Sequence, residues 1–316
     1  MELKQRNVLL ILLILGVISL FCVIPTFAQP QGQAATAEQT YGNMKFRLST
    51  SGHYQFETDI DDGGEFELYR ITAGLNMLYN LNSCTTLDTS FNYEHLNYDF
   101  SDEGYSRFPW NKIHSGTFRS VLRWRQNEQW EYFGGPIFTL GMEEGADWGD
   151  SIGGGATIGF KYFSSDTLTV GFGLGGVSQL EKADPLIVPF IILDWRFAPT
   201  WQLRNAINNL GAGGGAGLEL AWRCIGPLEL ALGGQVMRRD FRLDDNGRAK
   251  DGIGQERGYQ MYLMANLDIA RGVRLGAFAG GIVGGKIRLE DSNGDALRSE
   301  DYDSTPIAGA RLGFSF

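Results

Sequence analysis

The sequence predicts an all-β fold: a transmembrane, antiparallel, up-and-down β-barrel of about 14 strands, with 12 strands as the alternative. Three observations predict it. Apolar and polar residues alternate along many segments of the 316-residue chain, the connections between these segments are short and long in turn, and aromatic residues gather at the segment ends. Alternation gives each strand one apolar and one polar face. A membrane barrel needs both faces, because lipid lies outside it and a polar interior within.

The first 28 residues have the pattern of a secretory signal peptide. Lys4 and Arg6 precede an apolar stretch that ends at Ile24, and Ala28 offers a small residue for cleavage. An uncleaved membrane anchor is the alternative, because about 17 apolar residues is near the lower limit for spanning a bilayer. We expect a signal peptide at 1–28 and a disordered periplasmic tail at 29–43, which is polar and aperiodic. The alternative for this tail is a partial plug inside the barrel.

The remainder, 44–316, is predicted to be a single barrel domain. At its start, Met44 and Phe46 share one face, and Lys45 and Arg47 share the other. No helical periodicity and no linker interrupts the alternation that follows. The predicted strands are 44–58, 65–82, 84–98, 112–125, 129–141, 151–164, 166–179, 185–197, 200–207, 212–224, 227–243, 255–269, 272–290 and 303–316. The segment 200–207 is the shortest, and its loss together with a neighbour would leave 12 strands.

The connections between these strands alternate in length. The short ones are Asn80–Ser83, Gln126–Glu128, Ser164–Ser165, Ala198–Pro199, Ile225–Gly226 and Ala270–Arg271. The long ones are mostly acidic and include Asp59–Gly64, Asp99–Asn111, Glu143–Asp150, Asp244–Gly254 and Glu290–Ser304. Bacterial outer-membrane barrels have short periplasmic turns and long extracellular loops. We therefore expect the bacterial outer membrane as the location, with acidic loops facing outward.

Aromatic residues support the same orientation. Those beside the short turns are Tyr79, Trp124, Trp130, Tyr132, Tyr162, Trp195, Phe197, Trp201 and Trp222. Those near the opposite ends are Tyr54, Phe56, Tyr69, Tyr93 and Tyr259. Amphipathic rings prefer the boundary between membrane and water. The two groups predict a periplasmic and an outer aromatic girdle, although aromatic residues also favour strands in general.

The C-terminal strand alternates up to a final phenylalanine, with Leu312, Phe314 and Phe316 on one face. This ending resembles the terminal signal that the barrel assembly machinery reads in outer-membrane proteins. In architecture the whole chain resembles an uncharacterised, domain-of-unknown-function type family of bacterial outer-membrane β-barrel proteins. The resemblance implies the fold and the location. It brings no catalytic residues.

The polar face is predicted to line the lumen, because the apolar face must meet lipid. The candidate lumen-lining cations are Lys45, Arg47, Arg119, Arg123, Arg125, Lys161, Arg204, Arg223, Arg274 and Lys286. They predict a passive pore for small polar or anionic solutes. The alternative has nearly equal weight: the charges pair across strands and only hold the barrel together. The protein would then be a surface receptor, an adhesin or a structural outer-membrane protein.

Other function classes find less support in the sequence. The formal net charge of −10 argues against nucleic acid; the expected partners are outer-membrane lipid and lipopolysaccharide, the assembly machinery and small solutes. No cofactor motif is present. The acidic loop clusters are expected to be solvated charge, with divalent-cation binding as the alternative, and Ala296 breaks the calcium-loop pattern in the cluster that starts at Asp291. A hydrolase is disfavoured, because His114 and Ser115 are sequence neighbours and fall on opposite strand faces. Cys84 and Cys224 are expected to be free thiols.

Overall fold

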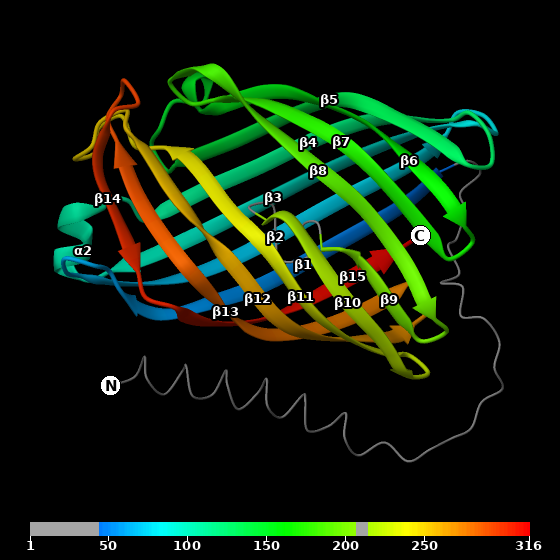
Figure 1. The fold of residues 1–316 in the computed structure, drawn as a ribbon. Coiled ribbons are helices and arrows are strands. Elements are labelled where there is room, and N and C mark those ends of the chain that lie inside the picture. Colours follow the sequence, from blue (N-terminus) through cyan, green and yellow to red (C-terminus); the bar gives the residue numbers. More distant parts are fainter. Residues whose placement is uncertain (1–43, 207–213) are drawn as a thin grey trace. The chain divides into compact units, whose positions relative to one another are not determined.

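The computed structural model describes residues 44–206 and 214–316; the predicted signal peptide and N-terminal tail lie outside them. Within these ranges, fifteen strands form one sheet (Figure 1). The strands are β1 (Met44–Asp59), β2 (Glu65–Asn80), β3 (Thr85–Phe100), β4 (Lys112–Arg125), β5 (Trp130–Glu143), β6 (Ile152–Ser165), β7 (Leu168–Gln179), β8 (Lys182–Ala198), β9 (Trp201–Asn205), β10 (Gly214–Ile225), β11 (Leu228–Arg242), β12 (Ile253–Ala270), β13 (Val273–Glu290), β14 (Ala296–Tyr302) and β15 (Thr305–Ser315).

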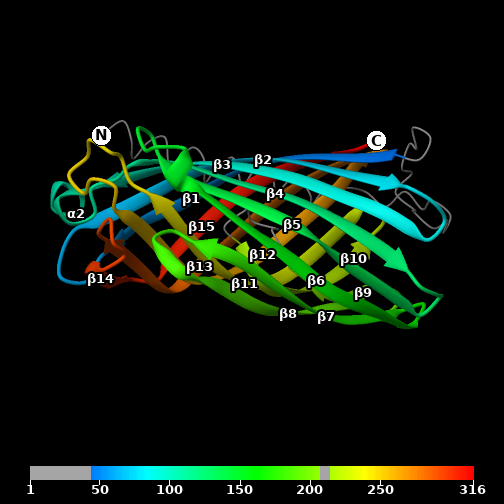
Figure 2. The same cartoon turned by 90° about the horizontal axis from the view of Figure 1, so that it is seen from above.

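The sheet closes on itself into a barrel. Each strand from β1 to β13 pairs antiparallel with the next, and β15 pairs with both β13 and β1. Strand β14 also pairs with β13, and only two residues separate it from β15. Together β14 and β15 therefore form the fourteenth strand of the wall (Figure 2). The predicted up-and-down barrel of 14 strands is confirmed, and the doubtful segment 200–207 contains β9.

The connections alternate much as predicted. One end of the barrel, here called the short-turn end, carries the connections 81–84, 126–129, 166–167, 199–200, 226–227 and 271–272. The other, the long-loop end, carries 60–64, 101–111, 144–151, 243–252 and 291–295, and the two-residue connection 180–181. A short helix, α2 (Asp102–Arg107), and a 3₁₀ turn, η1 (Gly149–Ser151), lie in these loops. No helix in the described part of the chain is long and apolar enough to cross a membrane.

Two predicted loops contain regular structure. The segment Glu290–Ser304 was expected to be a loop, but Ala296–Tyr302 forms β14, which extends the hairpin with β13. The sequence of β14 is polar and does not alternate. The hairpin that β14 forms with the end of β13 lies beyond the apolar belt, which is the band of exposed apolar residues around the middle of the wall. In Asp99–Asn111, Ser101 caps α2 by accepting a hydrogen bond from the Gly104 backbone N–H at 3.3 Å.

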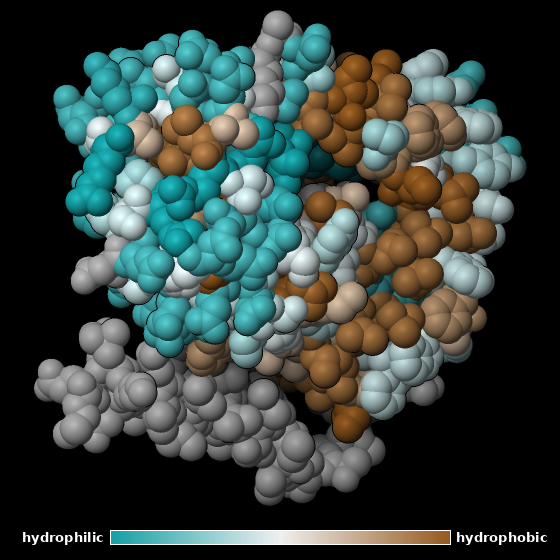
Figure 3. Space-filling view, turned by 60° about the vertical axis from the view of Figure 1, so that its left-hand side comes forward, coloured by the Kyte–Doolittle hydropathy of each residue, from teal (hydrophilic) through white to brown (hydrophobic). Residues whose placement is uncertain are grey.

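The apolar face of the alternation points outward. The outer residues are exposed over the middle of the wall, for example Ile158 (67%), Ile191 (69%) and Leu263 (64%). Their sequence neighbours turn inward: Tyr262 and Met264, which flank Leu263, are 1% and 2% exposed. In Figure 3 hydrophobic residues gather on the wall, and hydrophilic residues gather over the long-loop end. The barrel interior therefore holds the polar side chains and any functional site they form.

Candidate functional site: the barrel interior

Near the short-turn end the interior carries a lateral row of polar side chains. Strand pairing sets Arg47 opposite Asn76, Asn76 opposite Ser90, and Ser90 opposite Arg119. Their outward neighbours Leu48 and Phe118 are exposed (46% and 39%), which fixes the row on the inner face. Neither arginine forms an ion pair within the described residues. The row therefore presents positive charge to the lumen.

Other predicted lumen cations are paired across strands. Lys161 lies 2.8 Å from Glu131, Arg274 lies 2.6 Å from Asp268, and Arg123 pairs with Asp88. Arg125 lies over the Phe163 ring at 4.6 Å. These contacts support the alternative prediction, in which part of the lumen charge stabilises the wall.

Arg204 is the centre of the largest of these networks. From the short strand β9 it reaches Glu219 of β10 at 2.5 Å and Glu229 of β11 at 2.8 Å. Asn266 of β12 then donates to Glu229 at 3.3 Å, and Arg311 of β15 donates to Asn266 at 2.8 Å. A continuous polar chain thus ties β9 to β15 across the inner face. This network explains how β9, which is only five residues long, keeps its place in the barrel wall.

Toward the long-loop end the polar side chains of the inner face are buried. Arg239 contacts Glu256 at 2.6 Å, and Glu256 also accepts hydrogen bonds from the hydroxyls of Tyr98 (2.7 Å) and Tyr302 (3.0 Å). Arg70 lies 3.7 Å from Glu94, and its guanidinium lies 2.6 Å from Nδ1 of His53. The side chains of Arg70 and Glu94 are 1% and 0% exposed. We name Arg70, Glu94, Arg239 and Glu256 the buried charge cluster.

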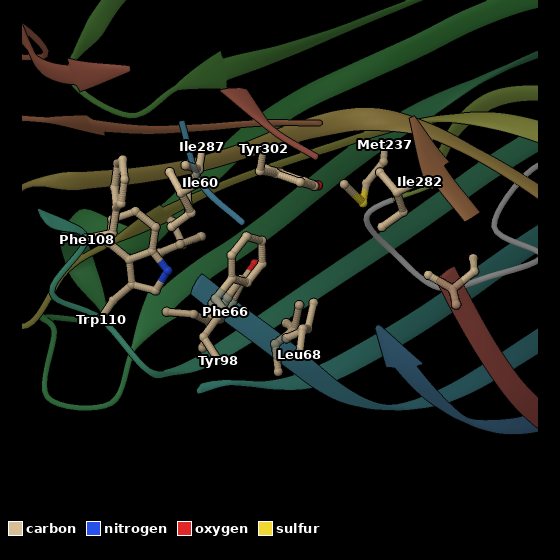
Figure 4. Close-up of a cluster of buried hydrophobic side chains, with 14 of the residues drawn as sticks. Ile60, Phe66, Leu68, Tyr98, Phe108, Trp110, Met237, Ile282, Ile287 and Tyr302 are labelled. Carbon is tan, nitrogen blue, oxygen red and sulfur yellow. The ribbon is translucent and has the colours of Figure 1, made fainter. Parts of the chain in front are cut away.

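Above the buried charge cluster, toward the long-loop end, the interior is filled by apolar side chains. Phe66 packs on Tyr302 with ring centres 5.1 Å apart, and Trp110 packs on Phe108 and Phe241, each at 5.4 Å. These residues come from opposite parts of the wall and from the loop 101–111, so they meet inside the barrel (Figure 4). We name the following set the apolar plug: Ile60, Phe66, Leu68, Tyr98, Phe108, Trp110, Phe241, Leu243, Ile287, Leu289 and Tyr302.

The strand ends and the loops hold the apolar plug in place. Glu143, at the end of β5, accepts the backbone N–H of Asn111 and of Asp244, each at 3.1 Å. One carboxylate thereby fastens the loops 101–111 and 243–252. Across the interior, Arg242 of β11 pairs with Met142 of β5. The long-loop end is therefore narrowed by backbone as well as filled by side chains.

Most predicted lumen residues lie on the inner face, and one does not. Lys45, Arg47, Arg119, Arg123, Arg125, Lys161, Arg204, Arg223 and Arg274 share the inward parity of their strands. Lys286 faces outward, contrary to the prediction, because its neighbour Ile287 points inward and is 0% exposed. A register shift in β13 beside Gly284, whose φ is +60°, inverts the alternation there. The C-terminal residues Leu312, Phe314 and Phe316 lie on the outer face.

Sequence reasoning missed most of the buried charge cluster. Its two arginines, Arg70 and Arg239, are not among the candidate lumen-lining cations. Arg70 lies between Tyr69 and Ile71, which point outward, so the alternation could have predicted that Arg70 points inward. Arg239 and Glu256 lie in charged runs near the long-loop end, where alternation of polar with apolar residues is lost.

The described residues contain no group of three or more His, Cys, Asp or Glu side chains that could hold a metal ion. His53 is enclosed by Arg70 and Phe278. His95 and His114 lie side by side on the outer face, with ring centres 4.9 Å apart. Ser115 points to the opposite side from His114, so these two residues cannot form a Ser–His pair.

Comparison with known proteins gives similarities of fold only. No protein-family model matches the chain, and no curated protein matches it. Among solved structures, the chain is similar to the COG4313 outer membrane channel from Pseudomonas putida F1 (TM-score 0.49, 10% identity, covering 90% of this chain and 100% of that one). It is also similar to the P. putida toluene transporter TodX (TM-score 0.39, 8% identity, 87% and 90%) and the NanC porin (TM-score 0.39, 7% identity, 84% and 98%).

Proposed function

We propose that the protein is an outer-membrane channel for small polar or anionic solutes, closed at its long-loop end by the apolar plug. The single observation that carries the proposal is the division of the lumen. A polar part with unpaired cations adjoins the short-turn end. Toward the long-loop end the interior is filled first by the buried charge cluster and then by the apolar plug.

The outer wall supports the membrane location. Large apolar side chains stay exposed all along it, and a soluble protein would bury a patch of that extent. Aromatic pairs stand beside the short turns on this face: Trp201 and Trp222 lie 5.5 Å apart, and Trp195 and Phe197 lie 5.3 Å apart. Such rings suit the membrane–water boundary. The sheet also closes through the pairing of β15 with β13 and β1, as a barrel in lipid requires.

The preference for anions follows from the unpaired cations of the lower lumen. Arg47 and Arg119 face the interior from strands β1 and β4, and no described carboxylate neutralises them by an ion pair. Guanidinium groups that line a water-filled passage raise the local concentration of anions and repel cations. A solute that enters from the short-turn end passes this row before it reaches the buried charge cluster.

Closure follows from the packing of the apolar plug. Trp110 and Phe108 are 0% exposed, and Phe66 is 1% exposed, so these side chains pack closely and fill the interior at this level. A channel with this plug conducts only after the loop 101–111, which supplies Phe108 and Trp110, moves aside. We therefore expect rare openings rather than the steady current of a general porin.

Single-channel recording in planar bilayers tests the proposal. The unmodified protein should give a closed baseline with brief openings that prefer anions. A variant with Phe108→Ala and Trp110→Ala should stay open far longer. Trp148→Ala is the matched control, because Trp148 lies on a neighbouring loop and is 64% exposed. A plug variant that opens no longer than the unmodified protein, or that gives no current at all, would contradict the proposal.

The second candidate function is a non-conducting barrel that acts as a surface receptor, an adhesin or a structural protein. The chain of polar contacts from Arg204 to Arg311 favours it, because such contacts stabilise a wall without any transport. Truncation of the loop 243–252 discriminates: a receptor loses its ligand, whereas a channel keeps or gains current. A hydrolase is the least supported candidate, and the expected assembly signal at Leu312, Phe314 and Phe316 is compatible with all three.

A further inference from the structure

Three cations lie in register on the outer face of the barrel at its long-loop end. Strand pairing sets Arg238 of β11 opposite Arg257 of β12, and Arg257 opposite Lys286 of β13. Like charges directly opposite each other on adjacent strands are destabilising. Nothing in the strand pattern requires three of them in a row. The row is therefore a candidate binding site for an anion that is not part of the described chain.

The outward orientation of these three residues is fixed by their inward neighbours. Met237, Glu256 and Ile287 are each 0% exposed and belong to the interior. Arg238, Arg257 and Lys286 each follow or precede one of them, so they point away from it. For Lys286 this depends on the register shift beside Gly284. Without that shift, Lys286 would point into the apolar plug.

Nearby carboxylates do not balance the positive charge. Arg238 pairs with Asp240 at 2.8 Å, Lys286 with Asp301 at 3.0 Å, and Arg288 with Glu290 at 2.8 Å. Arg257, at the centre of the row, donates to the amide oxygen of Gln255 at 3.0 Å and has no ion-pair partner among residues 44–206 and 214–316. Four cations thus face three carboxylates. The buried Nε atoms of Arg257 and Arg288 have no hydrogen-bond partner within the described residues, which leaves donors free for a ligand.

These side chains surround a cavity of about 180 Å³, lined by Gln255, Arg257, Lys286, Arg288 and Ser299. The cavity stands at a definite depth. Two residues further along β12, Tyr259 is 57% exposed, and Met261 after it is 59% exposed. Two residues of strand span about 6.6 Å, so the cationic row lies one step beyond the outer aromatic ring and the apolar belt. If the exposed apolar wall lies in a membrane, as proposed above, this is the level at which the lipid phosphate groups are expected.

We propose that this part of the outer wall binds the phosphate group of an anionic membrane lipid, with Arg257 at its centre. The inference rests on the proposed outer-membrane location, because only a membrane brings a lipid phosphate to this depth. Arginine forms strong, charge-assisted and often bidentate hydrogen bonds to phosphate. The bound phosphate relieves the repulsion along the row, while the acyl chains lie over Tyr259 and Met261.

The test uses the full-length purified barrel in an uncharged detergent, with thermal unfolding followed as lipid is added. Three probes separate the sources of phosphate: bisphosphorylated lipid A, its dephosphorylated form, and inorganic phosphate. Lipid A should raise the Tm of the unmodified protein at the lowest concentration, since a ligand of the folded state stabilises it. Arg257→Gln should raise by about tenfold the lipid A concentration that is needed for the same rise in Tm. This is the usual effect of losing one charge-assisted hydrogen bond.

Lys112→Gln is the matched control. Lys112 is also an outward cation at the long-loop end, but it faces Asn97 in the strand register and pairs with Glu144 at 3.1 Å. Its replacement should leave the lipid response unchanged. In the absence of lipid, Arg257→Gln should be at least as stable as the unmodified protein, because it removes a repulsion. Arg288→Gln is the second variant and should weaken the response in the same direction.

Three results would overturn the proposal: an unchanged response in both arginine variants, an equal response to dephosphorylated lipid A, or inorganic phosphate acting as strongly as the lipid. Cell fractionation tests the outer-membrane location independently of the lipid-binding experiment. A protein found outside the outer membrane would refute the proposed function while the phosphate affinity of the purified barrel stands on its own result.

Discussion

Replacement of Glu256 by Gln should strongly destabilise the barrel. Glu256 is 0% exposed and is the main partner of Arg239, whose other carboxylate, on Glu94, lies 4.0 Å away. It also accepts the hydroxyls of Tyr98 and Tyr302. Breaking a buried ion pair by removing one charge costs about 3–5 kcal/mol, because the remaining charge is left uncompensated. We expect a loss of unfolding free energy in that range.

Urea unfolding, followed by tryptophan fluorescence in detergent, measures this loss. With a urea dependence of about 2–3 kcal/mol per molar, the midpoint should fall by roughly 1–2 M. Glu103→Gln is the matched control, because Glu103 also pairs with an arginine, Arg107, at 3.3 Å but is 61% exposed. An exposed pair of this kind contributes about 0.3–0.5 kcal/mol. Equal midpoints for the two variants would refute the role given to the buried charge cluster.

The double variant Arg239→Met and Glu256→Leu separates charge from packing. Buried ion pairs replaced by apolar residues of similar volume are often neutral or stabilising. The double variant should therefore recover much of the stability that Glu256→Gln loses. A loss larger than that of the single variant would mean that the hydrogen bonds to Tyr98 and Tyr302, not the charges, stabilise the interior.

Three further predictions concern the apolar plug, the lumen charge and the outermost hairpin. Trp110→Ala should cost about 3–5 kcal/mol of unfolding free energy, as for other large-to-small core changes, while Trp148→Ala should cost almost nothing; equal urea midpoints would argue against a packed plug. Arg47→Glu with Arg119→Glu should reverse the anion preference in reversal-potential measurements under a salt gradient, and an unchanged preference would remove both residues from selectivity. The pKa of Asp291 is lowered by hydrogen bonds from backbone N–H groups of its own turn, so the carboxylate stabilises the turn above its unfolded pKa, and this contribution is lost as pH falls through the lowered value. NMR titration should give a midpoint below that of an exposed aspartate, and an ordinary midpoint would contradict the turn geometry.

The strands could be predicted because a single physical rule governs the middle of the wall. Wherever one strand face meets apolar surroundings and the other does not, side chains alternate, as at Leu228–Val236 and Gly258–Ile269. The rule also found most lumen cations, such as Arg47 and Arg119. Counting the alternating segments also gave the strand number, with the five-residue β9 inside the shortest and least certain segment.

The rule fails where the surroundings change. Beyond the apolar belt both strand faces are polar, so β14 carries no alternation and was read as a loop. At Gly284, a residue with positive φ, the inner and outer faces of β13 change places. The alternation of apolar and polar residues gives no sign of this shift. The prediction therefore put Lys286 on the wrong face. Phe108 and Trp110 sit in a predicted loop, and only three-dimensional closure of the barrel brings them against Phe241.

The central claim is that the apolar faces of the strands meet lipid and the polar faces enclose the lumen. Spin labelling at two neighbouring positions of β4, Thr117 and Phe118, tests it most directly, in a protein whose Cys84 and Cys224 have been replaced by Ser. In lipid vesicles, the label at 118 should collide readily with oxygen and hardly with a water-soluble nickel complex, and the label at 117 should show the opposite preference. Equal accessibility at both positions, or the reverse order, would contradict the account.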